Sequence, residues 1–213
     1  MIKIQNICKS FGTQKVLVDI NLSIKEREKI LITGQNGAGK TTLMRLILAE
    51  LIANSGELEI CGINPLKDRK NALKNLSFVP QTPPPLRLKI NELVEYAIKT
   101  SNSSLERIKL YLNALEFDFQ KESEKAFYKL SGGMKQKLLI AIALARASKI
   151  IMFDEPTANL DPRAREIFLN LLRENFKEQS MIFISHRLSE VKGIVKRIVE
   201  IDLGRIVKDK VVE

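Results

Sequence analysis

The sequence predicts an α/β protein with a mostly parallel sheet, a small antiparallel β subdomain at the N-terminus and an inserted α-helical subdomain. Short apolar runs at 30–33, 150–153 and 181–184 have the composition of strands that are buried on both faces, as in parallel sheets. The first 24 residues instead carry spaced isoleucines and β-branched stretches, which are typical of half-exposed strands. Two amphipathic helical patterns interrupt the α/β pattern between residues 86 and 134.

The length of 213 residues suits one domain, so we expect a single unit over 1–213 with 86–134 as the inserted helical subdomain. The N-terminus lacks the apolar core of a signal peptide. The longest apolar run, 138–145, is far shorter than the roughly 20 residues that a membrane helix needs. Cys8 and Cys61 form no CxxC pair, which favours reduced thiols. Together these features predict a cytoplasmic protein that crosses no bilayer by itself.

The chain is basic, with 35 Lys and Arg against 25 Asp and Glu and a net charge of +10. Such a charge fits either an anionic partner, such as nucleic acid or a membrane surface, or lysines spread over solvated faces. The densest basic cluster, at 67–70, includes Asp68, and no longer basic block occurs. We therefore favour solvated faces and expect no nucleic-acid partner.

Local signals place most of the elements. A helix is predicted over 41–51 and another over 135–147, from apolar residues at helical spacing. Three prolines at 83–85 exclude a helix interior or a central strand there. Asn91 can cap the helix that follows them, and Asp161 followed by proline predicts the start of a later helix.

A glycine-rich motif follows the apolar run at 30–33 and opens the helix predicted at 41. It reads Gly34, Gln35, Asn36, Gly37, Ala38, Gly39, Lys40 and Thr41, with Thr42 next, and matches G-x-x-x-x-G-K-[ST]. Main-chain N–H groups and a helix N-terminus can hold phosphates there, Lys40 can reach the β- and γ-phosphates, and Thr41 can bind Mg²⁺. A plain glycine-rich turn is the alternative, but the strand before and the helix after favour a phosphate-binding loop (P-loop).

Two acids follow the apolar run at 150–153. Ligands of α/β sheets bind beyond the carboxyl ends of the strands, so Asp154 and Glu155 are placed for chemistry. Asp154 can hold Mg²⁺, and Glu155 can polarise the water that attacks a γ-phosphate. An ordinary acidic turn is the alternative, and the phosphate motif upstream favours the functional interpretation.

Further motifs identify a family. Leu130-Ser131-Gly132-Gly133-Met134 precedes a long helix, and Ala158-Asn159-Leu160-Asp161 and a lone His186 follow Asp154 and Glu155 in order. In this order and spacing the set resembles the ABC-type ATPases, specifically the ATP-binding subunits of ABC transporters, over essentially the whole chain. Ser131 and two glycines at a helix start also form an anion site, although a flexible helix entry is the alternative.

The resemblance implies roles for individual residues. Phe11 would stack on adenine, and Gln81 would sense Mg²⁺ and the γ-phosphate. Ser131, Gly132 and Gly133 would complete the ATP site of an opposite subunit. Asp161 would couple the two sites, and His186 would contact the γ-phosphate. Phe11 stands where Tyr is more usual, and Met134 stands where the family usually has Gln.

The resemblance also implies partners. Two copies, or one copy and a homologous subunit, would bind ATP and Mg²⁺ head to tail on the cytoplasmic face of the membrane. A separate integral-membrane permease would then be energised by hydrolysis, and the Ser-Gly-Gly-Met-Lys-Gln-Lys segment is similar to that of exporter-type (ABC-2-like) systems. The alternative is a soluble ABC ATPase that acts on ribosomes or DNA.

Overall fold

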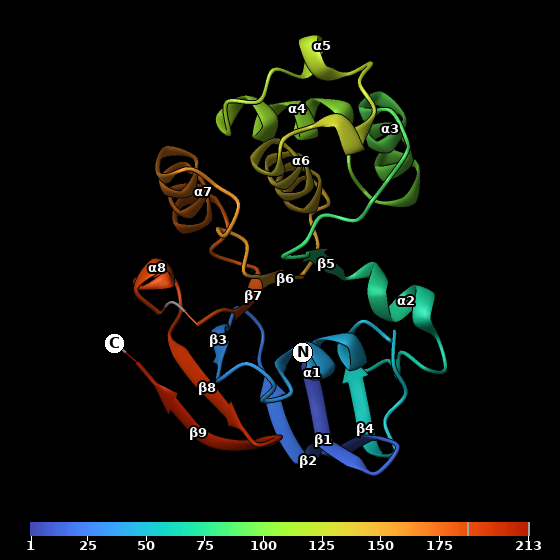
Figure 1. The fold of residues 1–213 in the computed structure, drawn as a ribbon, viewed down its shortest axis with the longest axis vertical. Helices are drawn as coiled ribbons and strands as arrows, with labels where there is room; N and C mark the ends of the chain where they lie inside the picture. Colours follow the sequence, from blue (N-terminus) through green and yellow to red (C-terminus); the bar gives the residue numbers. More distant parts are fainter. Residues whose placement is uncertain (187, 213) are drawn as a thin grey trace. The chain divides into compact units, whose positions relative to one another are not determined.

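The computed structural model of the protein describes residues 1–186 and 188–212. The chain divides into two compact units. The first comprises Met1–Leu76 together with the chain from Glu178 onward, and the second comprises Ser77–Lys177. Figure 1 shows the elements of each unit in the colours of the sequence.

The first unit contains two groups of strands with short helices. Its elements are β1 (Ile2–Phe11), β2 (Gln14–Ile24), β3 (Lys29–Thr33), α1 (Lys40–Ile47), β4 (Ser55–Ile60), α2 (Arg69–Lys74), β7 (Ser180–Ile184), α8 (Leu188–Val191), β8 (Arg197–Asp202) and β9 (Arg205–Val211). β1 pairs antiparallel with both β2 and β4. β3 pairs parallel with β7 and β8, and β9 closes this group antiparallel to β8. The predicted antiparallel N-terminal sheet and mostly parallel second sheet are confirmed.

One arginine ties the β8–β9 hairpin to the antiparallel sheet. The Arg197 guanidinium donates to both carboxylate oxygens of Asp209 at 2.6 Å, to Glu28 at 2.8 Å and to the Ser23 carbonyl at 2.9 Å. These bonds raise the pKa of Arg197 and lower the pKa of Asp209, because each charge is stabilised by its partner. The side chains of Arg197 and Glu28 are only 17% and 19% exposed, so solvent screens the ion pair between them weakly.

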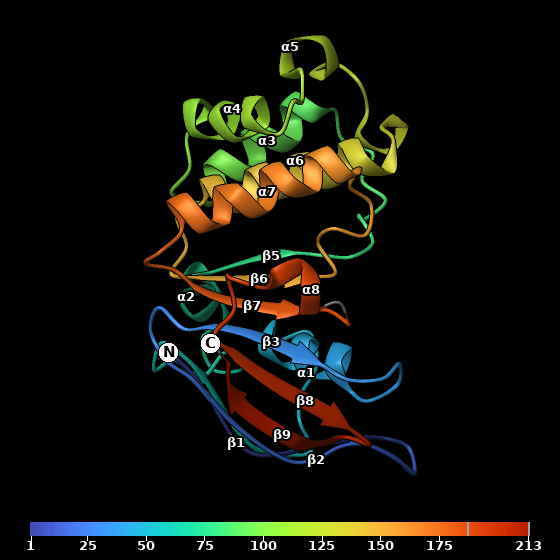
Figure 2. The ribbon, with the colours of Figure 1, turned by 90° about the vertical axis from the view of Figure 1, so that its left-hand side faces the viewer.

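The second unit is mostly helical. Its elements are β5 (Leu76–Val79), α3 (Ile90–Thr100), α4 (Leu105–Ala114), α5 (Phe119–Glu122), the 3-10 helix η1 (Phe127–Lys129), α6 (Gly132–Ala145), β6 (Ile150–Asp154) and α7 (Pro162–Asn175). β5 lies next to β6, and buried Ser77 and Ser148 share a 2.6 Å hydrogen bond between the two strand starts. α6 packs against α4, and α4 against α3 (Figure 2).

Three predicted boundaries move for identifiable reasons. The helix predicted over 41–51 ends at Ile47, because Ala49 adopts a left-handed backbone with φ of 52°. The helix predicted from 135 begins at Gly132, because Ser131 caps it. Asn91 does not cap α3. The cap position is Lys89, whose N–H donates to Glu92.

No helix within the described ranges is long and apolar enough to span a bilayer.

Candidate functional site

The phosphate motif forms the connection between β3 and α1 in the first unit. Gly34 has φ of 147°, and a Cβ added there would lie 2.0 Å from the carbonyl oxygen of Ile201 on β8. Only glycine allows this close approach of two main chains. The Gly204 N–H, in the β8–β9 turn, donates to the Ala38 carbonyl at 3.2 Å. The hairpin β8–β9 therefore holds the loop from one side.

The lysine of the motif lies against its own loop. Lys40 Nζ donates to the Gly34 carbonyl at 2.6 Å and to the Gln35 carbonyl at 2.8 Å. Gln35, Gly37 and Thr41 are exposed, and α1 begins with no side-chain cap and no acidic residue in its first turn. The positive end of the α1 dipole, an ammonium group and a hydroxyl thus occur together on an accessible surface, which suits an anion such as a phosphate.

His186 lies at the same edge of the sheet as the phosphate loop. β3 and β7 are parallel neighbours with Ile32 opposite Ile184, and the Ser185 N–H donates to the Ile32 carbonyl at 3.3 Å. The chain therefore leaves both strands at one edge, with the phosphate loop after β3 and exposed His186 after β7. The structure brings this pair of predictions together within the first unit.

Phe11 ends β1 at the tip of the β1–β2 hairpin. Its ring is 47% exposed, and the ammonium of Lys9 lies 5.0 Å from the ring centroid. On β2 the same hairpin presents the Val16 carbonyl and the Leu17 side chain to Gly39 of the loop. An exposed aromatic ring on a hairpin that packs against the phosphate loop has the surface needed to stack on a base.

The acids of the second unit lie at the end of β6. Asp154 is the last residue of the strand, and both Asp154 and Glu155 are half-buried. Glu155 has φ of 42°, which is uncommon for a residue with a side chain. The Glu155 carbonyl accepts from the Ala158 N–H at 3.1 Å, and the Thr157 carbonyl accepts from Leu160 at 3.1 Å. These turns fix the path of the chain between the end of β6 and the start of α7.

Two predicted residues of the second unit are helix caps. Ser131 Oγ accepts from the Met134 N–H at 3.2 Å and starts α6. Asp161 accepts from the Ala164 N–H at 2.9 Å and starts α7. That main-chain hydrogen bond holds the pKa of exposed Asp161 below its usual value. Gly132 and Gly133 lie inside α6 with ordinary helical backbones.

Gln81 lies in the coil after β5 and is exposed. Its carbonyl accepts from the Asn159 side chain at 3.1 Å. Gln136 on α6 bonds the carbonyls of both Pro80 and Pro156, at 3.3 Å each. Sequence reasoning assigned no role to Gln136 or Asn159. The available signal was a glutamine two residues before the apolar run 138–145, within the helix predicted over 135–147.

The residues predicted to bind a cation all carry oxygen donors. Thr41 in the first unit has a hydroxyl, and Gln81 and Asp154 in the second unit have an amide and a carboxylate, which are ligand types that Mg²⁺ prefers. Across the described ranges, no cluster of three or more His, Cys, Asp or Glu could hold a metal ion.

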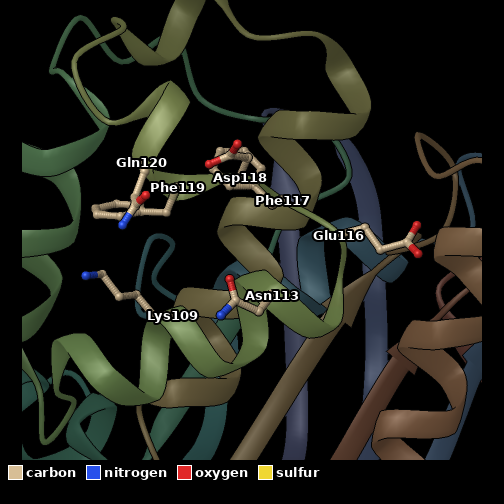
Figure 3. Close-up of a pocket in the computed structure, with 7 residues that line it drawn as sticks. All are labelled: Lys109, Asn113, Glu116, Phe117, Asp118, Phe119 and Gln120. Atoms are coloured by element: carbon tan, nitrogen blue, oxygen red, sulfur yellow. The ribbon is translucent and has the colours of Figure 1, made fainter.

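A separate open pocket of about 450 Å³ lies in the second unit, where α4 leads into α5 (Figure 3). Figure 3 shows Lys109 pointing toward Phe119, whose ring centroid lies 5.5 Å from the ammonium, while Glu116 points away. Glu116 pairs with Arg163 of α7. None of the predicted site residues lines this pocket, and its lining residues are Lys109, Asn113, Glu116, Phe117, Asp118, Phe119 and Gln120.

Comparisons with known proteins agree with the motifs. The family model described as "ABC transporter" matches residues 17–158. The lactococcin-A transport/processing ATP-binding protein LcnC of Lactococcus lactis is 35% identical over 208 residues, 93% of this chain. The bacitracin transport ATP-binding protein BcrA of Bacillus licheniformis is 32% identical over 217 residues, 98% of this chain and 69% of that protein.

The fold agrees as well. The dimeric ATP-binding cassette MJ0796, in a post-hydrolysis state bound to ADP and Pi, has a TM-score of 0.87 and 25% identity, covering 100% of this chain and 99% of that one. This chain spans 28% of the length of the lactococcin protein. The family match nevertheless covers well over half of the chain, from 17 to 158, and includes the phosphate loop, the segment 130–134 and the acids after β6. The chain therefore belongs to the ABC transporter family.

Proposed function

We propose that this chain binds and hydrolyses ATP and so energises transport through a separate membrane-spanning permease, from the cytoplasmic face of the membrane. The observation that carries the proposal is the phosphate loop. In this loop the main chain at Gly34 closely approaches β8. The Lys40 ammonium lies at the start of α1, which has no side-chain cap. The chain also belongs to the ABC transporter family. ATP presents a triphosphate of the kind that such a loop recognises.

Lys40 and the main-chain amides of residues 34–42 would hold the phosphates, and Phe11 would stack on the adenine. Lys40 would exchange its hydrogen bonds with the loop carbonyls for phosphate oxygens. Thr41, Asp154 and Gln81 would hold Mg²⁺, which supplies charge neutralisation on the phosphates when it is bound.

Glu155 would act as the general base. It would polarise a water whose oxygen forms a bond to the γ-phosphorus while the bond to the β–γ bridging oxygen breaks, and it would take up the proton of that water. The place of Glu155, directly after the carboxyl end of the buried strand β6, supports this role, because ligands of α/β sheets bind beyond that end. His186 would contact the γ-phosphate and Gln81 would report its presence.

The working unit would be a head-to-tail dimer, either of two copies or with a homologous subunit. Ser131, Gly132 and Gly133 of one subunit would close over the ATP held by the other, and Asp161 would couple the two sites. The dimeric structure of the cassette MJ0796 supports dimerisation. Residues 86–134, as an inserted helical subdomain, would relay closure and reopening to the permease.

A pair of variants tests the catalytic assignment. Glu155→Gln keeps the size of the side chain and removes the base, so we expect ATP binding and dimer formation with turnover at least 100-fold lower. Lys40→Ala should instead weaken nucleotide binding itself. Fluorescent-nucleotide titration, phosphate release and size-exclusion chromatography with Mg-ATP separate these outcomes. Wild-type turnover in Glu155→Gln would show that another group is the base.

The net charge of +10 keeps one alternative open, a soluble ABC ATPase that acts on ribosomes or DNA. Affinity purification from detergent-solubilised membranes decides between the two. A co-purifying protein with many membrane spans supports the transporter role, and ribosomes or DNA support the alternative.

Within the transporter role we propose export, on the likeness of residues 131–137 to exporter-type systems. Relatives of similar identity are named for lactococcin A, bacitracin and glutamine transport, so the proposed direction rests on residues 131–137 alone. The direction is testable by measuring ATP-dependent accumulation of cargo in inverted membrane vesicles, which export predicts and import excludes.

A further inference from the structure

We propose that Gln136 is a positioning residue that ties the Gln81 segment to the Glu155 segment. The inference rests on the proposed ATP hydrolysis and assigns a role to a residue of the 131–137 segment for which the sequence predicted none. The Gln136 side chain on α6 forms hydrogen bonds with two loops that are more than seventy residues apart in the chain.

The bridge is made by one amide group. Gln136 is fully buried, and its Nε2 donates to the Pro80 carbonyl and to the Pro156 carbonyl, at 3.3 Å each. A carboxamide NH₂ carries two hydrogens, so both bonds can form at once. Pro80 directly precedes Gln81, and Pro156 directly follows Glu155. One side chain thus fixes the main chain beside both predicted catalytic groups.

Stability alone does not account for a glutamine at this position. Gln136 Oε1 is buried, and it has no hydrogen-bond partner among the residues that the structure describes. A buried acceptor without a partner destabilises the folded state, so this oxygen does not favour a glutamine at the position. The neighbouring buried positions of α6 are Leu138 and Ile140. The glutamine is explained by the two carbonyls that it holds.

A second bridge links the same two segments. Asn159, in the turn that follows Glu155, donates through Nδ2 to the Gln81 carbonyl at 3.1 Å. Asn159 also lies over the start of α6, where its carbonyl oxygen is 3.0 Å from a Cβ added at Gly133. Gln81, Glu155 and the start of α6 are therefore connected by short, local contacts within one unit.

The bridge matters because it lies directly beside Glu155. The Pro156 carbonyl that Gln136 holds belongs to the residue that follows Glu155 in the chain. Without the Gln136 amide, the chain at Pro156 can move and shift the Glu155 carboxylate away from the attacking water. A small displacement of a catalytic group lowers turnover strongly while leaving the phosphate loop intact.

The test compares two methionine variants of α6. Gln136→Met keeps the volume and removes both donors, and Leu138→Met makes a similar packing change two residues away. For Gln136→Met we expect kcat to fall about tenfold or more and KM for ATP to stay within about twofold. The melting temperature should fall modestly, because the Pro80 and Pro156 carbonyls lose their donor. Leu138→Met should keep wild-type kcat. Gln136→Leu repeats the test if the first variant folds poorly.

Hydrogen exchange gives a readout that needs no turnover. In Gln136→Met, amides of residues 81–82 and 157–160 should exchange faster together, while those of β3 and α1 should not change. Unchanged exchange in both segments, or a kcat loss shared equally by Leu138→Met, overturns the inference. Failure of the wild-type protein to hydrolyse ATP would overturn the proposed function instead, and the exchange result would still decide whether Gln136 holds the two segments.

Discussion

Two helices of this chain, α1 and α6, begin at glycine-rich segments, and the two segments use glycine in different ways. Before α1, Gly34 has a positive φ and its Cα approaches the main chain of β8. At the start of α6, Gly132 and Gly133 have ordinary helical backbones, and an added Cβ at Gly132 would meet only the Asn159 side chain, at 3.8 Å.

The two segments differ in whether the fold or a ligand requires the glycine. The loop before α1 cannot keep its path with a side chain at Gly34, so that glycine is fixed by the fold. Alanine would suit the start of α6 better than Gly132, because glycine is the weaker helix former. We infer that Gly132 is retained for a molecule that approaches α6 from outside, as the proposed ATP of the opposite subunit would.

The largest effect is expected at the phosphate loop. Gly34→Ala places a Cβ 2.0 Å from a main-chain oxygen, so β8 or the loop must move, at a cost of about 3 kcal/mol or more. We expect a lower midpoint in urea unfolding and loss of nucleotide binding by fluorescent-nucleotide titration.

Gly37→Ala is the matched control, in the same loop and with positive φ, but with no atom within 4 Å of the added Cβ. It should cost only about 1–2 kcal/mol of backbone strain. Equal losses in the two variants would show that backbone conformation, and not contact with β8, decides the use of glycine here.

The opposite pattern is expected at α6. Gly132→Ala should leave stability unchanged or raise it by up to about 1 kcal/mol, because alanine favours the helix. ATP turnover should fall about tenfold or more, because a methyl group would stand where the phosphates of the opposite site are bound. Thermal unfolding and phosphate release measure the two effects separately. A wild-type rate in this variant would remove the ligand explanation for the glycine.

The sequence predicted the parts of the molecule that depend on local chemistry. The phosphate loop, the buried strands at 30–33, 150–153 and 181–184 and the Asp161 cap all follow from neighbouring residues. The end of α1 did not, because Ala49 becomes left-handed without a glycine to mark it. The roles of the site residues remain predictions.

Gln136 shows why other features could not be predicted. Its importance comes from carbonyls at Pro80 and Pro156, which lie far from it in the chain and which only the folded second unit brings together. The strained φ of Glu155 is likewise set by its surroundings, since nothing in the sequence of residues 154–157 requires it.

The smallest effect concerns α7, a third helix start, which differs from that of α1 in having a charged cap. The Ala164 N–H bonds the Asp161 carboxylate and lowers its pKa, and the helix dipole favours the same charge. A lowered pKa in the folded state means that this stabilisation is present above the unfolded pKa of about 4 and is lost as the pH falls further. Asp161→Asn keeps a capping oxygen without the charge.

The wild-type protein should therefore melt slightly higher than Asp161→Asn at pH 7, and the difference should shrink toward zero below about pH 3. Melting temperatures of both proteins between pH 7 and pH 2.5 test this expectation, with Glu166→Gln on the exposed side of α7 as the control for loss of one carboxylate. A difference that stays constant over this range would mean that the cap acts through hydrogen-bond geometry alone. In that case α7, like α6 with its neutral Ser131, would start without help from charge, and α1 would differ from both only in lacking a side-chain cap among the described residues.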